Sequence, residues 1–130
     1  MTARGRDRGA ISVILMILLV MVLAGAGLIV DGGRAMVARR HASNTAEASA
    51  RAAVASATPV AGFDPVAALA EAVSYANRAG VATADVRVVV GADFVTVTIT
   101  ERRQTVFLIL GGKQTMTVQA SGTARVTYSG

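Results

Sequence analysis

Twenty-one consecutive uncharged residues at positions 10–30 constrain this chain more than any other feature. The run reads AISVILMILLVMVLAGAGLIV and directly follows the charged segment RGRDRG. A helix rises 1.5 Å per residue, so the run is about 32 Å long and matches the hydrocarbon core of a bilayer, about 30 Å thick. Lipid offers no hydrogen-bond partners to free backbone groups, so a single segment crosses it only as a helix. The sequence therefore predicts a transmembrane helix at residues 10–30.

Two other interpretations compete with a permanent anchor. In a cleaved secretory signal, the arginines of residues 4–8 form the basic n-region, residues 11–23 the apolar region and residues 24–26 the cleavage site. In a soluble protein the run is a buried core helix, but a chain of 130 residues rarely encloses a helix that is apolar on every side. The apolar run continues past Ala26 through residues 28–30, which favours the anchor.

The charge is distributed unevenly along the chain. Residues 1–58 hold seven arginines against three acidic residues, whereas residues 59–130 hold six basic and five acidic residues. Basic flanks suit anionic lipid headgroups, and the nearly neutral distal part lacks the basic groove of a nucleic-acid-binding protein. Arginines lie on both sides of the run, so the positive-inside count is close to even. We expect the short basic tail, residues 1–9, in the cytoplasm and the larger distal part outside.

The sequence DGGR at residues 31–34 closes the apolar run. The simplest interpretation is an interfacial joint, in which Gly32 and Gly33 loosen the helix and Asp31 pairs with Arg34 three positions later. The alternative is a recognition element for a partner protein. Either interpretation makes these four residues the predicted membrane exit motif.

An alanine-rich stalk helix is predicted at residues 31–58, ending near Thr58 and Pro59. Alanines recur at every third or fourth position and line one face of this helix, including Ala38, Ala42, Ala46, Ala50 and Ala53. Such a stripe buries little area, so its value lies in letting a partner helix or sheet come close. We expect leucine at Ala46 and Ala50 to disrupt partner association more than folding. An alanine-rich helix without any partner is an equally good interpretation.

Residues 59–130 are predicted to form a small α+β domain. Asp64 and Pro65 are typical of a helix start, and Gly80 is typical of its end. The apolar period then changes from 3.6 to 2, which predicts antiparallel strands at residues 86–90, 95–100 and 115–128. A short helix is expected at residues 106–110, and Gly122 is expected to mark a bend or bulge. The fold class is therefore a long N-terminal helix followed by a helix packed on a three-stranded antiparallel sheet.

The sequence contains no catalytic constellation. It has no cysteine and a single histidine, His41, which lies beside two arginines and is a poor base or metal ligand there. The distal carboxylates have no metal-ligand spacing. Gly111, Gly112 and Lys113 do not complete the GxxxxGK[ST] pattern of a phosphate loop. We therefore expect no enzyme activity, cofactor, metal, nucleic acid or small-molecule substrate.

Residues 8–54 resemble the N-terminal region of TadE/TadG-like proteins of the Flp (tight adherence) pilus assembly system. The shared features are Gly9 before the span, the VDGGR sequence at its exit, and the alanine-rich helix with Arg40, Asn44 and Glu47. The distal order of VRVVV, VTVTI, LGG and TVQASGTARV is similar to that of compact family members. The resemblance covers most of the chain.

The resemblance implies a pilin-like layout and a single-pass, pseudopilin-like structural or assembly component of a bacterial Tad-type pilus or related secretion apparatus. Its distal domain would be extracytoplasmic, and its partners would be the lipid bilayer and other membrane proteins of that apparatus. Prepilin-like members carry a Glu five residues after the processed glycine. Here that position is Ile14, which argues against cleavage after Gly9. The alternative function is a small secreted binding protein released by signal peptidase after Ala26.

Overall fold

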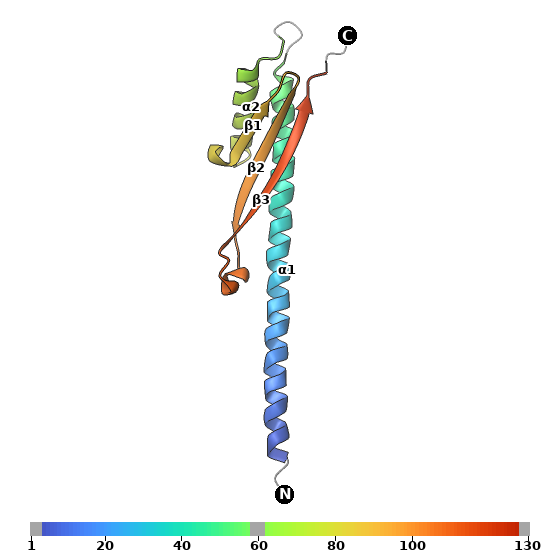
Figure 1. Cartoon of the computed structure of the whole chain (residues 1–130), viewed down its shortest axis with the longest axis vertical. Helices are drawn as coiled ribbons and strands as arrows, with labels where there is room; N and C mark the ends of the chain where they lie inside the picture. The colour runs from blue at the N-terminus through green and yellow to red at the C-terminus, as the bar shows by residue number, and fades with distance from the viewer. Residues whose placement is uncertain (1–3, 58–61, 128–130) are drawn as a thin grey trace.

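A single long helix dominates the molecule. The computed structural model describes residues 4–57 and 62–127, with side chains from residue 9 onward. Helix α1 (Arg4–Ala55) has 52 residues and is therefore about 78 Å long. Its N-terminal half projects well beyond all the other elements, which gather around its C-terminal half (Figure 1).

The predicted joint inside this helix does not form. Gly32 and Gly33 lie within α1, and the helix continues through them without interruption. A glycine in a helix interior costs only about 1 kcal/mol relative to alanine, and the helical residues on both sides outweigh that cost. The stop expected at Thr58 and Pro59 lies outside the described residues, and α1 itself ends at Ala55.

Helix α2 (Pro65–Arg78) begins as the sequence predicts. Asp64 has an extended backbone, and its side chain accepts a hydrogen bond from the Val66 amide at 2.9 Å. This is N-cap geometry, and the proline that follows it fits the first helical turn. Gly80 follows the helix end with a φ of 87°, a left-handed conformation that glycine adopts without steric cost.

Three strands form one antiparallel sheet in the order β1 (Val86–Val90), β2 (Phe94–Gln104) and β3 (Thr115–Arg125). The short 3₁₀ helix η1 (Thr83–Asp85) precedes β1, and a second one, η2 (Leu108–Gly111), lies between β2 and β3. The expected α+β fold class is thus confirmed, including a short helical segment in the apolar run after β2. The pairing of β2 with β3 is regular from end to end, so the bulge expected in β3 is absent.

The core lies between the sheet and the two helices. The C-terminal half of α1 lies across β2 and β3, and α2 lies beside α1 over β1 (Figure 1). Val95, Val97 and Ile99 point from β2 into this layer and are completely buried. The sequence predicts that α2 packs on the sheet, and the structure adds that α1 covers most of it. The opposite face carries hydroxyl pairs such as Thr96 with Thr123, 2.8 Å apart.

Gly122 has a different role from the predicted bulge. It is buried in β3, opposite Val97, where the strand meets α1. A Cβ atom on Gly122 would lie only 2.7 Å from the carbonyl carbon of Ala46. Backbone therefore packs directly on backbone at this point, and only a residue without a side chain fits between strand and helix.

Candidate functional site

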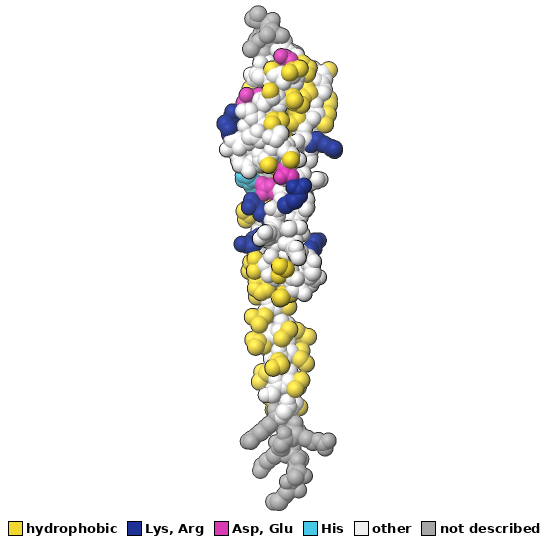
Figure 2. Space-filling view, turned by 90° about the vertical axis from the view of Figure 1, so that its left-hand side faces the viewer, with side chains coloured by type: hydrophobic (Ala, Val, Ile, Leu, Met, Phe, Trp, Pro, Cys, Tyr) yellow, Lys and Arg dark blue, Asp and Glu magenta, His cyan; other side chains and the backbone are white. Residues whose placement is uncertain are grey.

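Residues 9–23 of α1 are exposed along their whole length in the described structure. Its twelve large aliphatic side chains at residues 11–23 are each between 50% and 70% exposed. Figure 2 shows hydrophobic side chains on the visible face of the helix below the folded part. Of the described helices, α1 is the one long and apolar enough to cross a membrane, judged by length and composition.

At the end of the apolar run, Asp31 holds a loop from the other end of the chain. Its side chain is 1% exposed and accepts three consecutive backbone hydrogen bonds. The donors are the amides of Val106 at 2.9 Å, Phe107 at 3.0 Å and Leu108 at 2.9 Å. These residues open the segment 106–112, which we call the exit loop. The carboxylate thus fixes the exit loop to α1.

Hydrogen bonds from the exit-loop backbone, with a smaller contribution from a nearby charge, lower the pKa of Asp31. The Val106 amide lowers the pKa of Asp31 most, followed by the Leu108 amide. The Phe107 amide and the nearby charge of Arg34 lower this pKa further, whereas burial of the carboxyl raises it. The net pKa lies below the ordinary value of 3.8, so the carboxylate is charged at neutral pH. Three N–H donors converging on one carboxylate make it a stable clamp.

The expected pair of Asp31 with Arg34 is replaced by this clamp. No ion pair between the two occurs in the described structure, and the carboxylate oxygens instead face the exit loop. Arg34 is exposed on α1. Gly32 and Gly33 are also exposed, and a Cβ atom on either would meet nothing within 4 Å. Of the four exit residues, therefore, Asp31 is the one that makes a specific contact.

One helical turn before Asp31, the exit loop also touches the apolar run. Gly27 is buried, and a Cβ atom there would come within 2.6 Å of the Phe107 Cβ atom. The Phe107 side chain therefore covers the bare backbone of α1 at this position. From the sequence, Gly25 and Gly27 are small residues that suit packing of the span on a partner, but a contact of Gly27 with a residue eighty positions away leaves no local pattern.

The alanine stripe is occupied within the chain itself. All five alanines are at most 1% exposed: Ala38, Ala42, Ala46, Ala50 and Ala53. The last four belong to the core between α1, α2 and the sheet. The surface that they were expected to offer to another subunit is thus part of this protein's own core. Small side chains serve there because α1 lies close to β3.

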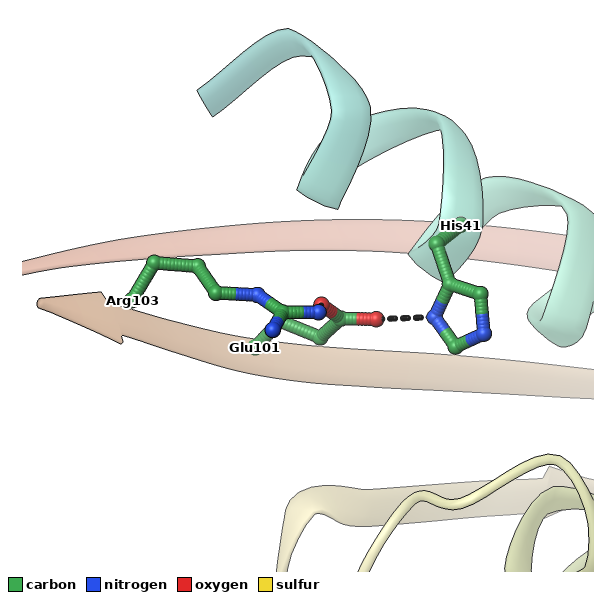
Figure 3. A network of polar contacts seen from close by, with 3 residues as sticks. All are labelled: His41, Glu101 and Arg103. Carbon is green, nitrogen blue, oxygen red and sulfur yellow. Dashed lines mark hydrogen bonds and ion pairs between the residues drawn. The ribbon is translucent and has the colours of Figure 1, made fainter. Parts of the chain in front are cut away.

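A buried acidic residue on β2 has a polar partner on each of two sides. Glu101 continues the inward-facing series of Val95, Val97 and Ile99 and is only 9% exposed. His41 of α1 contacts one carboxylate oxygen through Nδ1, and Arg103 donates to the other at 2.9 Å (Figure 3). A charge at an inward position requires such partners, because burial without them is costly. The sequence analysis missed this cluster, although strand alternation marks Glu101 as inward.

The described part of the chain shows no arrangement typical of catalysis. No group of three or more His, Cys, Asp or Glu side chains there lies close enough to hold a metal ion. Gly9, the candidate processing position, is exposed in the first turns of α1. The expectation that the chain is not cleaved after Gly9 stays a prediction.

The sequence of this chain matches one family model, described as putative Flp pilus-assembly, TadE/G-like, over residues 9–86. The matched part includes the apolar run, the exit residues, the alanine stripe and α2. No curated protein and no solved structure matches the chain.

Proposed function

The chain belongs to the TadE/G-like family of Flp pilus-assembly proteins, and we propose that it is a single-pass structural or assembly component of a Tad-type pilus apparatus. In this role residues 10–30 cross the cytoplasmic membrane, residues 1–9 stay in the cytoplasm, and the folded part lies outside. Its partners are other membrane proteins of the apparatus, and it performs no catalysis.

The exposure of the large aliphatic side chains at residues 11–23 of α1 is the single observation that supports this proposal. Each large aliphatic side chain contributes about 1.5–3 kcal/mol when it leaves water completely. Twelve such side chains cover residues 11–23 on every side of the helix, so no one-sided protein partner would shield them all. A bilayer surrounds a helix completely, and the length of the run fits its hydrocarbon core.

Continuity of α1 supports a mechanical role. The same helix that leaves the bilayer enters the core of the folded part, with no loop between the two. A displacement of the span is therefore passed directly to the sheet. The clamp at Asp31 adds a second connection at the membrane exit, between α1 and the segment that joins β2 to β3.

Single-cysteine labelling tests this topology, because the natural chain contains no cysteine. We would express Thr2→Cys and Ser121→Cys variants of the full chain and treat intact cells with a membrane-impermeant maleimide. The exposed Ser121 position on β3 is expected to react in intact cells, and position 2 only after lysis. Labelling at position 2 but not at position 121 in intact cells would reverse the proposed orientation.

N-terminal sequencing separates the anchor from the secreted alternative. The anchored protein is expected in the membrane fraction after alkaline carbonate extraction, with residues 10–30 still attached. A soluble product that begins at Gly27 would contradict the proposal and identify the protein as secreted after cleavage at Ala26.

A further inference from the structure

The exit loop exposes an apolar surface that the anchor alone does not explain. Its side chains at residues 106–110 are all uncharged and apolar. Val106 is 45% exposed, Phe107 37% and Ile109 49%. Leu110 is 86% exposed, the highest value of any large hydrophobic residue in the described part of the chain. Side chains of this kind rarely project into water together without a partner.

The depth of the exit loop along α1 points to the nature of this partner. Phe107 packs on Gly27, which lies inside the apolar run and four residues before Asp31. At 1.5 Å per residue, this contact is about 6 Å deeper along the helix than the carboxylate clamp. Whatever surrounds α1 at Gly27 therefore also surrounds Phe107.

The backbone of the exit loop suits an environment without water. Asp31 takes up the amides of Val106, Phe107 and Leu108. The amide of Leu110 donates to Phe107 at 3.0 Å, and that of Gly112 donates to Ile109 at 3.0 Å. Irregular backbone is tolerated at membrane depth only where its polar groups are satisfied within the protein. The exit loop meets this condition at these five amides.

Basic side chains lie where lipid headgroups would be. Arg34 and Arg103 line a common groove between α1 and the end of β2. Lys113 is exposed at the C-terminal end of the exit loop. Arg34 lies four residues beyond Val30, about 6 Å above the end of the apolar run, and headgroups occupy a layer of this thickness. Figure 2 shows the hydrophobic side chains extending up to the level of the first basic ones.

We propose that the exit loop is a second membrane-contacting element, whose Phe107, Ile109 and Leu110 side chains insert into the leaflet beside the transmembrane helix. The inference rests on the proposed anchor and adds to it. The occupant is lipid, because the apolar surface of the loop is continuous with that of the span and fixed at the same level. Two contacts with one leaflet would restrict the tilt and rotation of the folded part, which a single helix leaves free.

Lipid-borne quenching tests this insertion, because the natural chain contains no tryptophan. Single-tryptophan variants of the full chain would be reconstituted into phosphatidylcholine and phosphatidylglycerol vesicles with brominated acyl chains. Leu110→Trp reports on the exit loop, Leu18→Trp on the span, and Val89→Trp on β1, where the native side chain is 52% exposed. We expect bromines near the headgroups to quench most of the tryptophan fluorescence of Leu110→Trp. The emission maximum of this variant should shift to the blue. Leu18→Trp should be quenched by deeper bromines, and Val89→Trp by neither.

The three variants distinguish the two proposals. If Leu18→Trp is quenched while Leu110→Trp behaves like Val89→Trp, the insertion is wrong and the anchor stands. If Leu18→Trp itself is not quenched, the span is not in lipid, and the anchor and the insertion fall together.

Discussion

The two halves of α1 belong to one continuous helix but differ in the size and burial of their side chains. The N-terminal half carries large aliphatic side chains on every face, and none of those at residues 11–23 is buried. The C-terminal half carries a single narrow stripe of alanines, which is completely buried. A surrounding solvent of lipid favours large side chains all around a helix, whereas a sheet that approaches on one side favours small ones on that side only. Side-chain size along α1 therefore records what surrounds each half.

The largest effect on stability is expected when a buried alanine in the C-terminal half of α1 is replaced by a large side chain. Ala46 is 0% exposed and touches the strand that carries Gly122. Ala46→Leu should lower the free energy of unfolding by about 3 kcal/mol, since overpacking a tight core forces the backbone apart. The exposed Ala24 in the span is the matched control, and Ala24→Leu should leave the fold unchanged. Urea unfolding in detergent micelles, monitored by hydrogen exchange of the β2 amides, measures the stability of both variants.

This outcome differs from the expectation drawn from the sequence. The stripe was expected to bind another subunit, so that leucine would disturb association more than folding. With Ala46 and Ala50 both inside the protein's own core, folding is the property that leucine should disturb. Equal stability of Ala46→Leu and Ala24→Leu would show that the stripe does not pack as described.

A smaller change tests the same close approach from the side of the sheet. Gly122→Ala should destabilise by about 2 kcal/mol, because its Cβ atom would meet the backbone of α1 and not a movable side chain. Gly111→Ala is the control, since nothing lies within 4 Å of a Cβ atom there. The same unfolding measurement should show almost no change for the control. A tolerated alanine at position 122 would mean that α1 and β3 lie further apart.

The next effect concerns the charge buried between the two layers. His41→Ala should destabilise by about 1 kcal/mol, because Glu101 then keeps only Arg103 as a partner. In a Glu101→Gln background, the same histidine substitution should cost less, since no charge is left to neutralise. A double-mutant cycle measures this coupling. A coupling of zero would show that the contact in Figure 3 contributes nothing to stability.

The smallest effect on stability is expected at Asp31, and it is confined to pH values at which the carboxylate is ionised. Its pKa is lowered in the folded protein, so its contribution is complete above the ordinary value of 3.8. The contribution is lost as the pH falls below that value and through the lowered pKa. The protection of the Val106 and Leu108 amides from hydrogen exchange, relative to an unfolded peptide at the same pH, should therefore be high at neutral pH and fall in strong acid. In Asp31→Ala the protection of these amides should be low at both pH values.

Local patterns were sufficient for the elements of this fold. The period of apolar residues distinguishes helices from strands, and Asp64 with Pro65 marks the start of α2 because capping depends on neighbouring residues only. The alternation in β2 also places Glu101 on the inner face, so a buried charge there was predictable in principle.

Contacts between distant segments were not predictable in the same way. The bonds from Asp31 to the exit loop join residues at least 75 positions apart. No spacing rule connects them, and Asp31 has a closer apparent partner in Arg34. The contact of Phe107 with Gly27 is equally non-local. The site at the end of the apolar run therefore emerges only when α1 and the β2–β3 connection are placed together.

Spin-label accessibility along α1 is the most direct test of the contrast between its two halves. Single cysteines at Leu18 and at the exposed Glu47 would each carry a nitroxide in the full chain, reconstituted into vesicles. We expect the label at position 18 to be relaxed by oxygen and shielded from a water-soluble nickel complex, and the label at position 47 to show the reverse. Ready access of the nickel complex to position 18 would contradict the account, because the apolar half of α1 would then lie in water.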